Sequence, residues 1–421
     1  MRYLIYSFAR FFAALCLISN IPVCLYAQIF HSPPELVTYL EKAPSIISRA
    51  AVLIDIETGA LLYSKNPNTQ IPPASLTKLM TMHLLMKAIE DGRTSYDDLV
   101  EITAESWAQN QPRNSSLMFL EPGQIVTVRE IMLGMSIPSG NDAAVAAALH
   151  LAPTMRDFVE MMTSEARSMG LYVTRFTESS GISARNRTTA AEFALFSRQY
   201  INSHPESLSD FHSVRSFSFP TAANMPANRR FTTYTQNNSN GLLGFDGVDG
   251  LKTGFIGASG YNVALTAERD QTRFILVLLG APASSGGARL RNQEGALLLS
   301  WAFDNFKTVR PGINVNEETD MFTAQLWKGK TDTVELEPGE SLNFTSHVSR
   351  GDSLKFKSVI NEPVIAPLAA GVHIGDLYIS DEYGELCRKP LVTKYAYESG
   401  SVFKRVWHSI LLFLKKSNVL K

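Results

Sequence analysis

The stretch that decides the fold is "QIPPASLTKLMTMHLLMKAI", residues 70–89, in which two prolines are followed by a long apolar run. The prolines end any helix before them, because proline has no backbone N–H and biases its predecessor toward extended geometry. Beyond Ser75, apolar residues recur at roughly helical spacing with no glycine or proline between them. The pattern predicts a helix over residues 75–90, with Ser75 and Lys78 in its first turn.

Ser75 and Lys78 have two interpretations. A serine at a helix start is commonly an N-cap, and a first-turn lysine is commonly solvated. Three residues also advance only about 4.5 Å along a helix, so Lys78 can reach the Ser75 hydroxyl. A serine is a weak nucleophile without a base, and lysine serves as one only when burial or a nearby cation lowers its pKa. The second interpretation therefore requires a second cation, a proton relay and oxyanion donors elsewhere in the chain.

Composition limits the classes of protein. The 421 residues suit two domains with a proper core. Lys plus Arg number 39 and Asp plus Glu number 40, so no bulk charge indicates a nucleic acid partner. Beyond residue 27 the one cysteine is Cys387, which cannot form an internal disulfide. Because no Cys/His cluster indicates a metal, we expect a site without metal or cofactor.

The N-terminal segment predicts export. Arg2 and Arg10 precede an apolar run that ends near Ala27, which is typical of a signal peptide over residues 1–27. The alternative is an uncleaved membrane anchor, since Leu25 stands where a small residue is usual before a cleavage site. On either interpretation the rest of the chain leaves the cytoplasm.

Residues 35–310 mix strand and helix patterns. Apolar strand patterns flank the turns at 57–59 and 268–271, near the two ends of this segment. Helical patterns occupy residues 75–90, 128–135, 141–150, 154–169, 189–202 and 290–306. Strands at both ends with helices between predict an α+β domain, with one antiparallel sheet covered by helices.

The remainder of the chain divides in two. Residues 317–397 show short alternating runs between turn signals, which predicts a small all-β domain. Residues 399–421 predict a basic amphipathic helix whose apolar run is too short to span a bilayer. We expect this helix to lie on a membrane surface, its cations drawn to anionic lipid. The alternative is a helix docked on its own protein.

Two further stretches of sequence form a set of three motifs with Ser75 and Lys78. "PSGNDAA", residues 138–144, puts Ser139 and Asn141 in a turn before a helix of small residues. "DGLKTGFIGASGY", residues 249–261, puts Lys-Thr-Gly at the start of strand-like sequence. Each alone has an ordinary structural explanation, such as a turn that caps a helix. All three motifs in this order, at these gaps, form a much more specific pattern.

S-x-x-K, S-x-N and K-T-G together resemble the motif set of the penicillin-binding proteins and serine β-lactamases. Within that group, the chain resembles the low-molecular-mass D-alanyl-D-alanine carboxypeptidases, peptidase family S11, of the penicillin-binding protein 5 type. The resemblance implies a penicillin-binding/β-lactamase-like catalytic domain with helices on both sides of an antiparallel sheet. It also implies a β-rich second domain and an amphipathic C-terminal helix.

The resemblance assigns the catalytic roles. Ser75 would attack the carbonyl between two terminal D-alanines and form an acyl-enzyme, with Lys78 as proton acceptor and, in deacylation, as activator of water. Ser139 would relay the proton to the leaving amine. Asn141 would hold Lys78 and the substrate amide.

The resemblance also assigns the binding roles. Lys252 and Thr253 would bind the substrate carboxylate, and an extended peptide could lie against Gly254. The backbone N–H groups of Ser75 and Phe255 would form the oxyanion hole. Phe255 replaces the more usual polar residue after K-T-G. Arg291 would reach the carboxylate, although a surface helix arginine is the alternative.

The implied function is removal of the terminal D-alanine from peptidoglycan pentapeptide stems, with β-lactams as covalent inhibitors. The implied location is the outer face of the cytoplasmic membrane, which is the periplasmic side where an outer membrane exists. A β-lactamase or esterase is the enzymatic alternative, but Glu178 lacks the E-x-x-L-N context of a deacylating glutamate. A penicillin-sensing binder is the non-enzymatic alternative, and the intact Ser75, Lys78, Ser139 and Lys252 argue against it.

Overall fold

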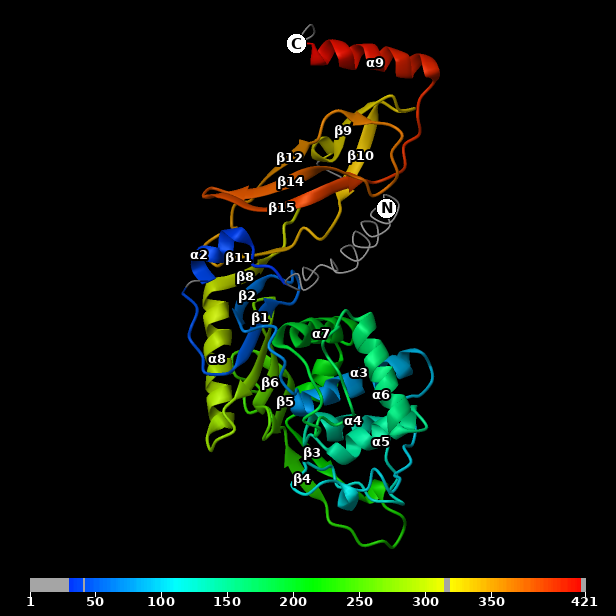
Figure 1. Ribbon diagram of the computed structural model, residues 1–421, viewed down its shortest axis with the longest axis vertical. Helices are drawn as coiled ribbons and strands as arrows, with labels where there is room; N and C mark the ends of the chain where they lie inside the picture. Colours follow the sequence, from blue (N-terminus) through cyan, green and yellow to red (C-terminus); the bar gives the residue numbers. More distant parts are fainter. Residues whose placement is uncertain (1–29, 41, 314–318, 418–421) are drawn as a thin grey trace, which may run out of the picture.

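The computed structural model describes residues 30–40, 42–313 and 319–417 of the chain. The predicted signal peptide, residues 1–27, lies outside the described residues. The described chain is elongated, with a helix-rich domain at one end, a sheet-rich domain beside it and a last helix at the far end (Figure 1). The predicted α+β architecture is confirmed.

A five-stranded sheet is the centre of the first domain. All its neighbouring strands pair antiparallel, in the order β2 (Leu61–Lys65), β1 (Ala50–Asp55), β7 (Thr272–Ala281), β6 (Gly260–Arg269) and β5 (Val248–Ile256). The first strands and the last strands of the domain therefore meet in the middle of one sheet. Successive side chains of a strand point to opposite faces. Val52 and Val277 accordingly face one apolar core, and Leu53 and Leu276 face the other.

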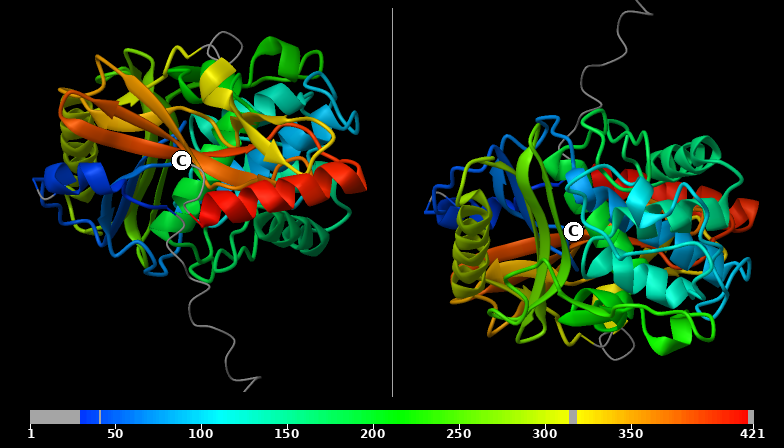
Figure 2. Two further views of the ribbon diagram at one scale, coloured as in Figure 1. Left: turned by 90° about the horizontal axis from the view of Figure 1, so that it is seen from above. Right: turned by 90° about the horizontal axis from the view of Figure 1, so that it is seen from below.

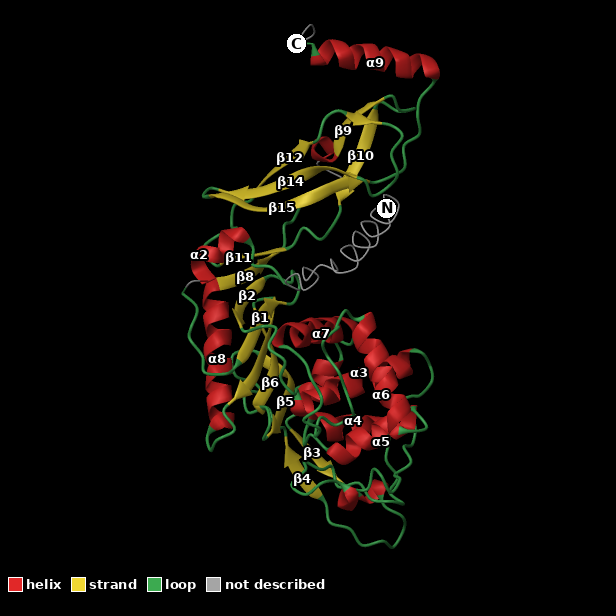
Figure 3. Ribbon diagram, viewed as in Figure 1, coloured by secondary structure: helices red, strands yellow, loops and turns green. Residues whose placement is uncertain are grey.

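Helices cover both faces of this sheet, in three layers (Figure 3). On one face lie α3 (Thr77–Glu90), α4 (Val128–Ser136), α5 (Asn141–Leu151), α6 (Met155–Ser168) and α7 (Ala190–Ser203). On the other face lie α8 (Gly287–Asn305) and the short α2 (Val37–Leu40). These bounds agree with the predicted helices within three residues. A hairpin of β3 (Ser216–Phe219) and β4 (Tyr234–Asn237) stands beside the sheet.

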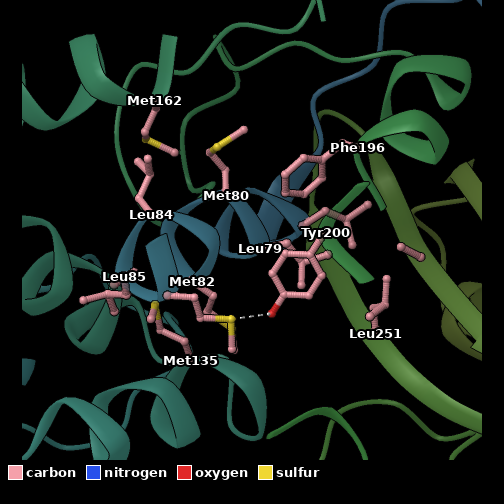
Figure 4. Packing of buried hydrophobic residues seen from close by; sticks show 14 of the residues in the cluster. Leu79, Met80, Met82, Leu84, Leu85, Met135, Met162, Phe196, Tyr200 and Leu251 are labelled. Atoms are coloured by element: carbon pink, nitrogen blue, oxygen red, sulfur yellow. Dashed lines mark hydrogen bonds between the residues drawn. The ribbon is translucent and has the colours of Figure 1, made fainter. Parts of the chain in front are cut away.

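Helix α3 lies in the core of this domain rather than on its surface. Every residue from Thr77 to Met86 is buried, as expected for a helix that is apolar on all sides. Figure 4 shows methionine and leucine side chains of α3 packed among Met135, Met162, Phe196 and Leu251. The alanines of α5 are buried beside it, so that the two helices approach closely. The first turn of α3 is thereby fixed.

One predicted boundary is wrong. Lys-Thr-Gly was expected at the start of a strand, but β5 begins at Val248 and Lys252–Gly254 lie in its middle. The glycines and aspartates before the motif resemble a turn in sequence. In the structure they continue the strand, with an irregularity in the pairing between Val248 and Gly250. The motif therefore lies along an edge strand, which pairs only with β6.

The second domain is a separate β structure. Its six-stranded sheet has the order β12 (Lys355–Ile360), β14 (His373–Asp381), β15 (Gly384–Thr393), β10 (Thr333–Pro338), β9 (Thr323–Trp327) and β13 (Val364–Ile365). The strands enclose their own apolar cluster, distinct from the two cores of the first domain. This domain supplies none of the predicted motif residues.

One carboxylate joins the two domains. Asp55, at the end of β1, is fully buried, and its Oδ2 accepts hydrogen bonds from the hydroxyls of Thr308 at 2.7 Å and Thr345 at 2.8 Å. These threonines belong to β8 (Phe306–Val309) and β11 (Phe344–His347), which pair antiparallel. Burial raises the pKa of Asp55, and the hydrogen bonds oppose that shift. The junction therefore depends on hydroxyl donors from the paired strands β8 and β11.

The last helix, α9 (Val402–Lys416), lies across the far end of the second domain (Figures 1 and 2). Its polar side docks on that domain. Lys404 pairs with Asp332 at 2.8 Å, and the His408 ring accepts the Lys328 backbone N–H at 2.8 Å. Its apolar side is exposed and consists of Val402, Phe403, Val406, Trp407, Ile410 and Phe413. Among the described helices, none is both long and apolar enough to cross a bilayer.

We expect Thr345→Val to loosen the junction between the domains, because it removes a donor from a buried carboxylate. The loss should be about 1–3 kcal/mol, which for a domain of this size is roughly 2–4 °C of melting temperature per kcal/mol. Thermal unfolding would measure it, with Thr333→Val at an exposed strand position as the matched control. Equal melting temperatures for the two variants would contradict a structural role for this contact.

Candidate active site

Ser75 lies in a single 3₁₀ turn, Ala74–Leu76, that leads directly into α3. No side chain caps either helix start, so the N-cap interpretation of Ser75 is wrong. Ala74 has a left-handed φ of 53°. The loop residue Gly181 packs directly against the Ala74 backbone, since a Cβ on Gly181 would lie 1.9 Å from the Ala74 carbonyl oxygen. Backbone contact therefore holds the turn that carries the serine.

Lys78 is completely buried one turn further along, so the solvated interpretation is also wrong. Its Nζ lies 3.2 Å from Ser75 Oγ and donates to Asn141 Oδ1 and the Ser180 carbonyl at 2.7 Å each. Burial lowers the pKa of Lys78 to about 7, although two nearby carboxylates act in the opposite direction. At neutral pH a substantial fraction of this amine is uncharged and able to accept a proton.

Ser139 and Asn141 lie on either side of Gly140 at the start of α5. Ser139 has a φ of 65°, and its buried Oγ has no hydrogen-bond partner within the described ranges 30–40, 42–313 and 319–417. Buried hydroxyls are normally paired, so this one is available to a ligand. Asp142, one position on, accepts the backbone N–H groups of residues 118–120 and anchors the turn.

Lys252 is buried on β5, and its Nζ donates to the Thr253 carbonyl at 3.1 Å. Burial holds the pKa of Lys252 well below its usual range, and the charges of Lys78 and Arg291 add to that effect. The pKa of Lys78 is thus lowered by burial rather than by this second lysine, whereas the charge of Lys78 lowers the pKa of Lys252. A Cβ on Gly254 would lie 2.9 Å from the Ser75 nitrogen, so the strand runs directly along the serine.

A cavity of about 490 Å³ opens above these groups. Its lining includes seven of the nine predicted residues, and the side chains of the other two, Lys78 and Lys252, are buried beside it. The seven are Ser75, Ser139, Asn141, Thr253, Gly254, Phe255 and Arg291.

Arg291 contributes a charged side chain to the lining of the cavity, and Phe255 contributes an aromatic one. Arg291 is buried, which lowers its pKa to about 10, and its guanidinium donates to Asn292 Oδ1 at 2.8 Å. The surface-arginine interpretation is therefore wrong. Phe255 is 46% exposed and stacks on Tyr261 with ring centroids 4.3 Å apart.

Sequence reasoning missed several groups at this site. The Ser180 carbonyl holds Lys78, the Ser239 hydroxyl lies 2.7 Å from that of Thr253, and Arg113 and Tyr261 line the cavity. The Ser180 contact could not be predicted, because a backbone carbonyl has no signature in sequence. Ser239 belongs to no motif, and only the fold brings it beside β5.

No group of three or more His, Cys, Asp or Glu side chains in the part of the chain that the structure describes could hold a metal ion. The chemistry available in the cavity is that of a hydroxyl beside a partly neutral amine, a second hydroxyl and two further cations. This combination suits nucleophilic attack by Ser75 on a substrate that carries a carboxylate.

Comparisons with known proteins agree with this geometry. Residues 38–283 match the family model of D-alanyl-D-alanine carboxypeptidase, peptidase S11, and residues 307–399 match the penicillin-binding protein 5 C-terminal domain. The D-alanyl-D-alanine carboxypeptidase DacC of Escherichia coli is 32% identical over 375 residues, which is 88% of this chain and 89% of that protein.

Two solved structures extend the likeness. Penicillin binding protein 5 of Haemophilus influenzae superposes with a TM-score of 0.73 at 29% identity, covering 85% of this chain and 99% of that one. Penicillin-binding protein D2 of Listeria monocytogenes, solved in a cefotaxime-bound form, has a TM-score of 0.53 at 27% identity, covering 62% of this chain and 99% of that one.

The matches define a serine hydrolase of the penicillin-binding type. The chain belongs to the peptidase S11 family of D-alanyl-D-alanine carboxypeptidases. The resemblance carried by its three motifs is thereby confirmed.

We expect Gly181→Ala to disturb this site, because the residue has a φ of 89° and a new Cβ would collide with the Ala74 backbone. The left-handed geometry alone costs about 1–2 kcal/mol, and the collision must move either the Ser75 turn or the Ser180 carbonyl. The rate of covalent labelling by a fluorescent penicillin should fall tenfold or more.

The control is Gly257→Ala, on the rim of the same cavity, where a Cβ would meet no atom within 4 Å. Unchanged labelling in Gly181→Ala would mean that this contact does not position the serine.

Proposed function

We propose that this protein removes the terminal D-alanine from peptidoglycan pentapeptide stems through an acyl-enzyme on Ser75. The observation that carries the proposal is the buried Lys78 amine, with its pKa lowered to about 7, at 3.2 Å from the Ser75 hydroxyl. A general base is most effective when its pKa lies near the working pH. Family membership supports the choice of a D-alanyl-D-alanine bond as the target.

In acylation, neutral Lys78 takes the Ser75 proton as Ser75 Oγ bonds to the carbonyl carbon between the two D-alanines. The oxyanion forms beside the backbone N–H groups of Ser75 and Phe255, which the close approach of Gly254 to the serine supports. The unpaired Ser139 hydroxyl relays this proton from Lys78 to the leaving amine, so that the terminal D-alanine departs and Lys78 is neutral again. Asn141 keeps Lys78 in position through its 2.7 Å hydrogen bond.

The substrate carboxylate is bound by Thr253 and Arg291, with Lys252 supplying positive charge behind them. Arg291 supports this role because it is buried, lines the cavity and has no carboxylate partner among the described residues. A buried cation without a partner is costly unless an anion binds to it. These three groups select a free C-terminus over an internal peptide bond.

In deacylation, neutral Lys78 accepts a proton from the water that attacks the acyl carbon, and it returns this proton to Ser75 Oγ as the acyl–oxygen bond breaks. The glutamate-assisted route of a β-lactamase has little support. The Glu178 oxygens accept N–H groups of their own loop, at 2.7 Å from Ser180 and 2.9 Å from Gly181, rather than facing Ser75. We therefore expect β-lactams to act as covalent inhibitors that leave slowly. Penicillin-binding protein D2 of Listeria monocytogenes, to which this chain is similar, is solved in a cefotaxime-bound form.

We further propose that residues 35–310 form the peptidase unit, residues 317–397 a β-rich spacer and residues 399–421 a peripheral membrane anchor after export by a cleaved signal peptide. The support for the anchor is the orientation of α9. Its polar side chains contact the second domain, while its exposed apolar side faces away. An interfacial helix binds lipid through such a face.

We expect the unaltered chain to release D-alanine from diacetyl-Lys-D-Ala-D-Ala, whereas Ser75→Ala should release none and take no penicillin label. Removing the nucleophile eliminates the acyl-enzyme. Ser64→Ala, at an exposed position in β2, is the matched control. Label on Ser75→Ala would show that another residue is the nucleophile, and stable label without D-alanine release would favour a penicillin-sensing protein.

The acylation rate should rise with pH, because only the uncharged form of Lys78 accepts a proton. With a pKa of about 7, the rate should fall about tenfold per pH unit well below 7 and level off above about 8. Stopped-flow labelling between pH 5 and 9 would measure it, with melting temperatures over the same range as the control for unfolding. A rate that is flat or decreases with pH would exclude Lys78 as the base.

Phe403→Ser together with Phe413→Ser should weaken binding to anionic vesicles at least tenfold. Burial of one phenylalanine side chain in an apolar environment contributes about 1.5–3 kcal/mol. Co-sedimentation with vesicles would measure the change, and Tyr383→Ser with Tyr395→Ser, two exposed aromatics outside α9, is the control. If both pairs bind alike, α9 is not the lipid contact.

A further inference from the structure

Outside the active-site cavity, the first domain has a second hollow of about 490 Å³. Arg175, Arg185 and Arg187 line it, together with Gln70 and the strongly exposed Tyr172. None of the three sequence motifs contributes to it. A hollow with three arginines and no acidic lining has the chemistry of an anion site.

The arginines have no ion-pair partner among the residues that the structure describes; Arg187, for example, donates instead to backbone carbonyls of its own loop. The acidic residues of the same segment point inward. Glu178 accepts the N–H groups of Ser180 and Gly181, and Glu192 accepts the N–H and hydroxyl of Thr174 at 2.7 and 2.6 Å. Because these two carboxylates form hydrogen bonds within their own segment, they do not neutralise the positive charge of the hollow.

The fold also holds two of these cations side by side. Arg175 and Arg187 face each other across an antiparallel bridge, joined by backbone hydrogen bonds of 2.8 and 3.0 Å. Like charges directly opposite one another are destabilising in such a pair. A bound anion would relieve this repulsion.

The hollow borders the active site through one loop. Ser180 holds Lys78 with its carbonyl, and Gly181 and Ile182 line the catalytic cavity. Arg185 follows Ile182 by three residues, a separation of at most about 10 Å along an extended chain. The rim of one hollow is therefore close to the other.

We propose that this arginine hollow binds a carboxylate of the substrate stem, on the residues that precede the two D-alanines; this rests on the proposed function. Thr253 and Arg291 bind the terminal carboxylate of the substrate. The upstream residues of the substrate must therefore extend away from these two groups. The loop from Ile182 to Arg187 offers a path along which a negatively charged upstream residue gains two or three arginine partners. The hollow then selects stems with a free carboxylate over stems in which it is amidated.

An anionic lipid headgroup would have similar chemistry, but the position of the hollow favours the substrate. The hollow lies in the helix-rich domain, whereas α9 lies at the opposite end of the molecule (Figure 1). A membrane bound through α9 would contact that far end. The loop of the hollow instead borders the catalytic cavity.

The test compares two synthetic pentapeptides that end in Lys-D-Ala-D-Ala and differ only in whether an upstream glutamate carboxylate is free or amidated. The ratio of their kcat/KM values should favour the free carboxylate about three- to tenfold. Arg175→Gln with Arg185→Gln should bring this ratio close to one, and added salt should lower it because exposed charges are screened. Arg156→Gln with Arg167→Gln, exposed arginines on α6, removes the same charge elsewhere and should leave the ratio intact.

A ratio that survives the Arg175/Arg185 changes, or that is already one in the unaltered chain, would overturn the proposal. So would unchanged selectivity with weaker binding of the same variant to anionic vesicles, which would assign the hollow to lipid. Failure of the proposed function would instead appear as no D-alanine release from either pentapeptide. In that case, binding of the two pentapeptides to the Ser75→Ala chain, measured by calorimetry, still decides the carboxylate preference.

Discussion

The burial of one amine beside one hydroxyl is the constraint on which the site depends. Lys78 is fully buried, and among the described residues its amine contacts the Ser75 hydroxyl, the Asn141 side chain and the Ser180 carbonyl. Each of these comes from a different segment of the first domain. A lysine in water would hold its proton near neutral pH, so the shift in its pKa is a property of the fold rather than of the residue.

Several features of the fold follow from this burial. Helix α3 must lie inside the domain, which explains why its sequence is apolar on all sides. Its first turn must meet an edge strand and a loop at close range, and Gly254 and Gly181 are the positions where a side chain would prevent that approach. Asp142 fixes the turn that brings Asn141 to the amine. The second domain meets the first around Asp55, where Glu57 also accepts a hydrogen bond from Asn343 and Thr58 contacts Thr345.

Most helices and strands could be predicted from the sequence, because their apolar periodicities are local patterns. The helix at 75–90, the alanine-rich helix after Asn141 and the strands near both ends of the domain have periodicities that tertiary packing reinforces. The β5 boundary was missed because Asp249 and Gly250 favour turns locally, whereas pairing with β6 keeps them extended. Here a tertiary contact overrides local preference.

The site residues could be predicted from the sequence where their side chains belong to one of the three motifs. The burial of Lys78, Lys252 and Arg291 has no local signature, since each depends on neighbours far along the chain. The contacts of the Ser180 carbonyl and the Ser239 hydroxyl also have no local signature in the sequence. The roles of the motif residues remain predictions that the experiments above address, whereas the family is established by its matches over most of the chain.

The lowered pKa of Lys252 has a thermodynamic consequence for any anion that enters the cavity. Burial and the charges of Lys78 and Arg291 disfavour the protonated form of this amine, and a negative charge that arrives beside it favours that form. Occupancy by a carboxylate therefore raises the pKa of Lys252, and by reciprocity the protonated amine favours carboxylate binding more than the neutral amine does. A rise in pH favours the neutral form of Lys78 but weakens carboxylate binding over the range in which Lys252 loses its proton.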